Sequence, residues 1–130
     1  MKIVDFASIG TNDLAQYLFA ADRRDEAMSG LLDPFTPALL RAVAAVCRGA
    51  TGQAWVGVCG EAASDPTWAV LAVGLGVTEL SMQGVAVPEV RAALKAVTLD
   101  RCRDAAQAAL DAADADEARA IGSSLVKEPS

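Results

Sequence analysis

Histidine is absent from this chain of 130 residues. Without an imidazole, the chain cannot form a Ser-His-Asp triad, a Cys-His dyad or most kinds of zinc site. Cysteine, carboxylates and arginine are the side chains that remain as candidates for chemistry.

Cysteine is scarce as well, with Cys47, Cys59 and Cys102 far apart in the sequence. An odd number of cysteines at this spacing gives neither a disulfide framework nor a C-x-x-C pair. We therefore expect a reducing compartment, the cytoplasm.

Basic residues are outnumbered, with 11 Lys and Arg against 17 Asp and Glu and a net charge of -6. Nucleic-acid binders usually present a basic face to the phosphate backbone. The longest uncharged stretch, residues 66–78, is too short for a membrane span, and the chain becomes charged too early for a signal peptide. The sequence predicts neither nucleic acid nor a membrane as a partner.

What the sequence does contain is an alternation of strand-like and helix-like segments, with enough apolar content, 53%, for one core. Runs of apolar and β-branched residues predict strands near residues 2–9, 54–58 and 77–82. Helical patterns predict helices over residues 14–21, 37–49, 67–75, 87–97 and 99–113, and a last short helix with a loose tail within 114–127. Strands joined by helical crossovers run parallel, so the fold class is α/β, with three successive β-α units.

Several residues mark the boundaries of these elements. Gly10 and the three residues after it predict a tight turn that ends the first strand. Thr36 and Pro37 are typical of the N-cap and the first residue of a helix, and Gly49 of a helix end.

The helix over residues 67–75 has apolar side chains all round, including Trp68 and Leu71. Such a helix must be covered on every side, so we expect it to meet a second subunit or a part of the domain that is missing from these 130 residues. Three parallel strands also leave two open edges, which favours a piece of a larger barrel or an obligate oligomer.

Near the start, residues 8–14 read SIGTNDL, followed by Gln16-Tyr17 and Ala21-Asp22-Arg23. These residues resemble the signature of the phosphoenolpyruvate-utilising enzymes, most closely that of Enzyme I of the bacterial sugar phosphotransferase system, a phosphoenolpyruvate-protein phosphotransferase. Further motifs agree in the same order: Asp33-Pro34 with Pro37, GVCGE at 57–61, GLG at 74–76 and ELSM at 79–82. The resemblance implies the last three β-α units of a (β/α)8 barrel of TIM type, an incomplete barrel, over residues 1–130.

Two adjacent residues, Asn12 and Asp13, have the first roles that the resemblance implies. Asn12 matches the asparagine that contacts the substrate phosphate, and a helix start suits an anion. Asp13 matches a ligand of Mg²⁺, which prefers oxygen donors. From the residues alone, Asn12 could equally be a helix N-cap and Asp13 a favourable charge at a helix N-terminus.

Arg23 matches the arginine that binds the phosphoryl group, a role that suits a planar cation with several donors. By itself it could also be a cation at a helix C-terminus beside Asp22. Around it, Arg24 and Asp25 replace the usual Gly and Asn of the family.

Cys59 matches the acid that protonates the methylene carbon of enolpyruvate. The alternative is a buried, inert cysteine, which is what we expect of Cys47 and Cys102 on apolar helix stripes. If the resemblance holds, Asn12, Asp13 and the Cys59 thiol share one cavity.

The resemblance implies phosphoenolpyruvate and pyruvate as ligands, and Mg²⁺ that binds weakly or not at all to this segment. It also implies a phosphocarrier protein that acts through an upstream domain, and a homo-oligomer. We expect the 130 residues alone to have no transfer activity. The other interpretation is a dimerisation or regulatory module without catalysis, or a domain that is stable only when joined to the rest of a barrel.

Overall fold

The computed structural model describes residues 4–22, 24–27, 32–50 and 54–127, which form an α/β fold with one small sheet. The strands β1 (Phe6–Gly10), β2 (Trp55–Cys59) and β3 (Glu79–Ser81) are parallel and lie in chain order, β1-β2-β3. The described helices are α1 (Thr11–Phe19), α2 (Pro37–Gly49), η2 (Glu61–Ser64), α3 (Pro66–Leu75), η3 (Gly84–Ala86), α4 (Val87–Lys95), α5 (Leu99–Leu110) and α6 (Ala115–Lys127). The predicted α/β class is confirmed.

The sheet has one covered face and one open face. Parallel strands in chain order, joined by crossovers of one hand, place their connecting helices on the same side of the sheet. The side chains of Ile9, Val56 and Val58 are buried on that side. On the other side Phe6 and Trp55 stay partly exposed, and their rings stack with centroids 4.7 Å apart.

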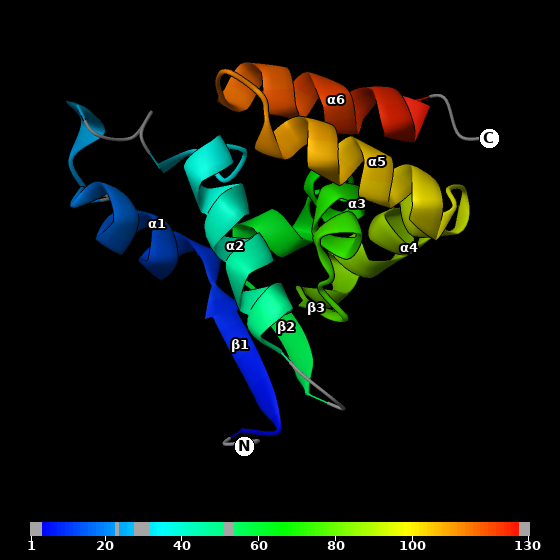
Figure 1. Cartoon of the computed structure of the whole chain (residues 1–130), viewed down its shortest axis with the longest axis horizontal. Coiled ribbons are helices and arrows are strands. Elements are labelled where there is room, and N and C mark those ends of the chain that lie inside the picture. Colours follow the sequence, from blue (N-terminus) through cyan, green and yellow to red (C-terminus); the bar gives the residue numbers. More distant parts are fainter. Residues whose placement is uncertain (1–3, 23, 28–31, 51–53, 128–130) are drawn as a thin grey trace.

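Helix α3 is the centre of the helical layer. Its residues Trp68 to Ala72 are all fully buried, and it packs against α2, α4, α5 and α6. Figure 1 shows α5 and α6 side by side, with α3 beneath them. The apolar helix is therefore covered by helices of this chain, and the expectation that a second subunit or a missing part of the domain covers it is wrong.

Two glycines allow this close packing around α3. A methyl group on Gly74 would collide with the backbone carbonyl of Cys102 in α5. A methyl group on Gly122 of α6 would lie 2.8 Å from the carbonyl oxygen of Thr67. Helix α3 thus touches the backbone of both neighbours without intervening side chains.

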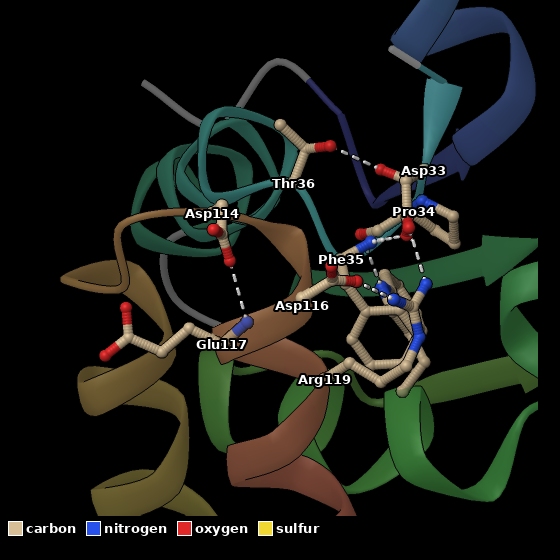
Figure 2. Close-up of polar contacts among 9 residues, drawn as sticks. Asp33, Pro34, Phe35, Thr36, Asp114, Asp116, Glu117 and Arg119 are labelled. Carbon is tan, nitrogen blue, oxygen red and sulfur yellow. Dashed lines mark hydrogen bonds and ion pairs between the residues drawn. The ribbon is translucent and has the colours of Figure 1, made fainter. Parts of the chain in front are cut away.

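A polar cluster fastens α6 to the segment that precedes α2 (Figure 2). The guanidinium of Arg119 donates to Asp33 at 2.6 Å and lies 4.5 Å above the ring centroid of Phe35. Its other nitrogen donates to Asp116 at 3.1 Å. The hydrogen bond to Asp33 and the negative charge of that carboxylate raise the pKa of Arg119, which favours its protonated form.

The indole of Trp68 reaches the same segment from α3. Its Nε1 donates to the carbonyl oxygen of Pro34 at 2.9 Å, so the buried ring has its polar atom paired. The segment before α2 is thereby bonded both to α3 and to α6.

Several predicted boundaries are confirmed. Thr36 is the N-cap of α2, Pro37 is its first residue and Gly49 its last. The helix predicted from 67 begins at Pro66, because the Asp65 carboxylate accepts from the backbone N–H groups of Thr67 and Trp68.

Other boundaries differ from the prediction. Strand β1 covers 6–10 and passes directly into α1 at Thr11, so there is no tight turn at 10–13. Gly10 is the N-cap of α1, with φ -88° and ψ 102°, which rules out Asn12 as the cap. Helix α1 ends at Phe19 because Ala20 takes the left-handed conformation, and α5 ends at Leu110, three residues earlier than predicted.

Candidate active site

The carboxyl ends of the three strands meet along one edge of the sheet. Gly10 pairs with Cys59, and Cys59 pairs with Ser81, so the last residues of β1, β2 and β3 lie in one row. In parallel α/β proteins this edge is where loops and helix starts collect functional groups. Three of the four predicted site residues, Asn12, Asp13 and Cys59, end or directly follow a strand here, and Arg23 lies outside the described residues.

Asn12 and Asp13 lie in the first turn of α1, where backbone N–H groups have no partner within the helix. Asn12 is half-buried and lines a hollow of about 400 Å³ with Gly60, Glu61, Ser64 and Gln83. This hollow lies between α1 and the segments that follow β2 and β3. The positive N-terminal end of α1 therefore faces the same hollow as the side-chain amide of Gln83 and the carboxylate of Glu61.

Asp13 is exposed, and its carboxylate lies beside Gly10. A Cβ added to Gly10 would lie 3.7 Å from Oδ2 of Asp13. It lines a different hollow, of about 650 Å³, with residues of α1 and the segment after it: Gln16, Tyr17, Ala20, Ala21, Asp22 and Arg24. The expected single cavity is therefore divided, with Asn12 and Asp13 lining separate hollows.

Cys59 ends β2 and is exposed, so the alternative of a buried, inert cysteine is wrong for this residue. Its thiol donates to the carbonyl oxygen of Ile9 in β1, with a sulfur-to-oxygen distance of 3.6 Å. The thiol thus lies against the neighbouring strand β1 at Ile9, and Ile9 stands two residues before the start of α1.

The other two cysteines differ from Cys59 in their surroundings. Cys102 is buried in the core, and Cys47 is half-buried. Burial raises the pKa of both thiols, and in each case a neighbouring arginine lowers it by less. The expectation that Cys102 is a core residue is confirmed.

Gly60 forms the turn after Cys59 with φ 113° and ψ -176°, a backbone conformation that residues other than glycine rarely adopt. A Cβ at this position would lie 3.0 Å from Oγ1 of Thr11 and 3.9 Å from Nδ2 of Asn12. The turn that carries the thiol is therefore packed against the start of α1.

Thr11, which lies beside this turn, is a further candidate that no sequence motif indicated. Its side chain is 1% exposed, and Oγ1 has no hydrogen-bond partner in the described ranges. Glu61 and Gln83 were also missed, although both line the hollow beside Asn12. The available signal was position, because each stands within two residues of a strand end.

Arg23 lies outside the described residues. Beside it, Arg24 donates to Asp22 at 3.0 Å, and both side chains are exposed. Arg24 is therefore engaged with the Asp22 carboxylate.

The donor set for Mg²⁺ in this chain is small. Within residues 4–22, 24–27, 32–50 and 54–127, no cluster of three or more His, Cys, Asp or Glu side chains could hold a metal ion. Mg²⁺ uses one or two carboxylates together with water and phosphate oxygens. Asp13 fits as one such ligand, but the described residues do not complete a site.

No helix in the described part of the chain is both long and apolar enough to cross a membrane. The protein defined by this fold and edge is an α/β domain built from β-α units, with functional groups at the carboxyl ends of its strands.

Sequence comparisons give the family. Residues 1–99 match the family described as PEP-utilising enzyme, PEP-binding domain. The chain belongs to this family of PEP-utilising enzymes, as the motifs near Asn12 and Cys59 predicted.

The curated relatives carry more specific names. The chain is 51% identical over 127 residues to a phosphoenolpyruvate-protein phosphotransferase of Streptomyces coelicolor, covering 97% of this chain and 23% of that protein. It is 52% identical over 110 residues to one of Haloferax volcanii, covering 84% of this chain and 20% of that protein. A multiphosphoryl transfer protein of Escherichia coli is 37% identical over 126 residues, 96% of this chain and 15% of that protein. The chain thus spans less than a quarter of the length of these relatives.

Proposed function

We propose that residues 1–130 are the C-terminal part of the substrate-binding domain of a phosphoenolpyruvate-protein phosphotransferase. The observation that carries the proposal is the row Gly10, Cys59 and Ser81 at one sheet edge, with Asn12 and Asp13 directly after it. The names and the identity of the curated relatives support the same activity.

The complete domain would be a (β/α)8 barrel that includes these three strands. One face of the sheet is covered by helices, while Phe6, Ser8, Cys59, Glu79 and Ser81 are exposed on the other. In a barrel this second face lines the interior, and the free edges of β1 and β3 pair with further strands. The open face and the two open edges support this architecture.

In the proposed site, the phosphate of phosphoenolpyruvate lies at the start of α1. Free N–H groups of the first turn and the amide of Asn12 bind its oxygens, because both present donors to an anion. Arg23 supplies a further cation to the phosphoryl group. Asp13 supplies one oxygen ligand to Mg²⁺, whose chemistry would be to neutralise phosphate charge, and other ligands come from outside this chain.

Cys59 is the proposed acid. When the phosphoryl group leaves, the enolate of pyruvate remains, and the thiol gives its proton to the methylene carbon to form the methyl group of pyruvate, which leaves Cys59 as a thiolate that takes a proton from water. An exposed thiol at a strand end can approach a substrate in this way, whereas the core thiol of Cys102 cannot.

The phosphoryl group itself must pass to a residue outside this sequence, which has no histidine. In the complete protein we propose a histidine on an upstream domain, from which a phosphocarrier protein takes the group toward sugar uptake. Positioning and charge neutralisation account for most of the catalysis of such transfers. A cytoplasmic location stays a prediction.

The activity is tested by replacing the corresponding segment of the Streptomyces coelicolor relative with residues 1–127 of this chain. The chimera should form pyruvate from phosphoenolpyruvate, and Cys59→Ala should lower the rate by roughly 10²-fold or more. Cys47→Ala is the matched control and should keep the rate. A folded chimera without pyruvate formation would contradict the proposed function, and full activity of Cys59→Ala would contradict the role of the thiol.

The barrel is tested by the two tryptophans. Trp55 is 37% exposed on the open face, and Trp68 is fully buried. Iodide should quench Trp55 in the 130-residue chain, and the upstream barrel segment should protect it, while Trp68 serves as the internal reference. Unchanged quenching of Trp55 in the joined protein would contradict a closed barrel.

The structure does not favour the other interpretation, a dimerisation or regulatory module without catalysis. That interpretation depended on an apolar helix surface, but Trp68 and Leu71 are covered within the chain. A homo-oligomer stays a prediction, and sedimentation at micromolar concentration checks it.

A further inference from the structure

The hydroxyl of Thr11 is unusual because it is buried without a hydrogen-bond partner among the described residues. Burying an unpaired hydroxyl lowers the stability of a protein, and a hydrophobic group of the same shape avoids that cost. A residue that costs stability at the edge of a candidate active site is better explained by function than by packing.

The position of this hydroxyl indicates what it does. It lies beside Gly60, where a Cβ would come within 3.0 Å of the oxygen. Gly60 directly follows Cys59, whose thiol is held by the carbonyl oxygen of Ile9 at 3.6 Å. Through these contacts, the first residue of α1 is packed against the turn that sets the direction of the thiol.

We propose that Thr11 is a positioning residue for Cys59, and the proposal rests on the proposed role of that thiol as an acid. The small oxygen allows the Gly60 turn to lie close to α1, and this closeness keeps the thiol against β1. Because Gly60 has φ 113° and no side chain, it can move if its neighbour changes. Thr11 therefore acts on the reaction through the backbone at Gly60 and need not touch the substrate.

Substitutions at Thr11 separate this role from a structural one. Thr11→Val keeps the branched shape but puts a larger methyl group where the oxygen lies, so it should push Gly60 away and release the thiol from Ile9. Thr11→Ser keeps the oxygen and should leave the turn in place. If the threonine had a purely structural role, Thr11→Val would change the stability of the chain and leave the reactivity of the Cys59 thiol unchanged.

The experiment measures the rate at which iodoacetamide alkylates Cys59 in the full 130-residue chain at one fixed pH. Mass spectrometry follows each cysteine, and Cys47 in the same molecule is the internal reference. We expect Thr11→Val to raise the ratio of the Cys59 rate to the Cys47 rate by roughly threefold or more, because a displaced turn changes access to the thiol. Thr11→Ser should keep the wild-type ratio, and urea unfolding should show that both variants are folded.

Two results would overturn the proposal. One is an unchanged rate ratio in a folded Thr11→Val chain, and the other is a Thr11→Val chain that does not fold. Thr11→Ala is the second variant: it removes the oxygen that packs beside Gly60, so the turn can move into the vacated space and take the thiol away from Ile9. An unchanged ratio there would count against the proposal as well. Alkylation requires no phosphoenolpyruvate, so this test can fail or succeed independently of pyruvate formation by the chimera.

Discussion

Arg119 and Asp33 are 86 positions apart in the sequence, and their side chains meet at 2.6 Å. The contact joins α6, which lies beyond the part matched by the family, to the segment before α2, which lies within it. Because Phe35 lies under the same guanidinium, one side chain combines an ion pair with a cation–π contact (Figure 2). The C-terminal helix is thereby part of the same folded unit as the candidate site.

Replacing Arg119 with lysine should destabilise the chain. Lysine keeps the charge but loses the planar fork that reaches Asp33 and Asp116 while stacking on Phe35. We expect a loss of about 1 to 2 kcal/mol in the free energy of unfolding, measured by urea denaturation. Arg103→Lys is the matched control, because its pair with Asp100 at 3.6 Å is exposed, and it should change stability by less than about 0.5 kcal/mol. Equal effects of the two substitutions would contradict the prediction.

Gly74→Ala should be among the most damaging small substitutions. The added methyl group meets the carbonyl of Cys102, so α3 and α5 must move apart. Overpacking of this kind costs about 1 to 3 kcal/mol, which thermal unfolding will show as a lower melting temperature. Gly84→Ala is the control, since nothing lies within 4 Å of a Cβ at that position. A Gly74→Ala chain with wild-type stability would show that α3 and α5 are not in contact.

The three cysteines should react with iodoacetamide in a fixed order. Cys59 is exposed, Cys47 is half-buried and Cys102 is buried, and burial raises the pKa of the last two thiols. Because the thiolate is the nucleophile, both effects slow Cys47 and Cys102. Peptide mapping after short alkylation should find Cys59 modified first and Cys102 last in the native state, with the order lost in urea.

Stability should fall at alkaline pH because of the buried thiols. A pKa that is raised on folding means that the folded chain keeps a proton that the unfolded chain has already released. The contribution is complete below the ordinary thiol pKa and is lost as the pH rises toward the raised value. Cys102→Ala should therefore show a shallower loss of stability above about pH 8.5 than the wild type, measured by urea unfolding across pH. Parallel curves would exclude Cys102 as the cause.

Local signals in the sequence were reliable where a few neighbouring residues decide the structure. Thr36 and Pro37 start α2 as predicted, because a fixed proline φ suits the first residue of a helix. The start of α1 was harder to predict, since Gly10 could either turn the chain or cap a helix. In the structure Gly10 caps the helix, so Asn12 and Asp13 lie in the first turn of α1. Side chains of successive helical residues point in different directions, and these two line different hollows.

Long-range packing was beyond the sequence pattern. The apolar residues of α3 showed that the helix must be covered, but not by what, because a helix surface does not identify its partner. The backbone contacts at Gly74 and Gly122 with other elements are what place α5 and α6 over it. In the same way, nothing in the order of residues 11 and 60 predicts that a buried threonine hydroxyl lies against a glycine turn.

The sequence by itself determined the α/β class, the family and the residue types available for chemistry, because periodicity, caps and short motifs are properties of neighbouring residues. Only the tertiary structure decided that Cys59 is exposed beside Ile9, that Asn12 and Asp13 line different hollows and that α6 is locked to Asp33. The physical reason is that exposure, cavities and ion pairs depend on segments that are distant along the chain and come together only when the apolar surface of α3 is buried.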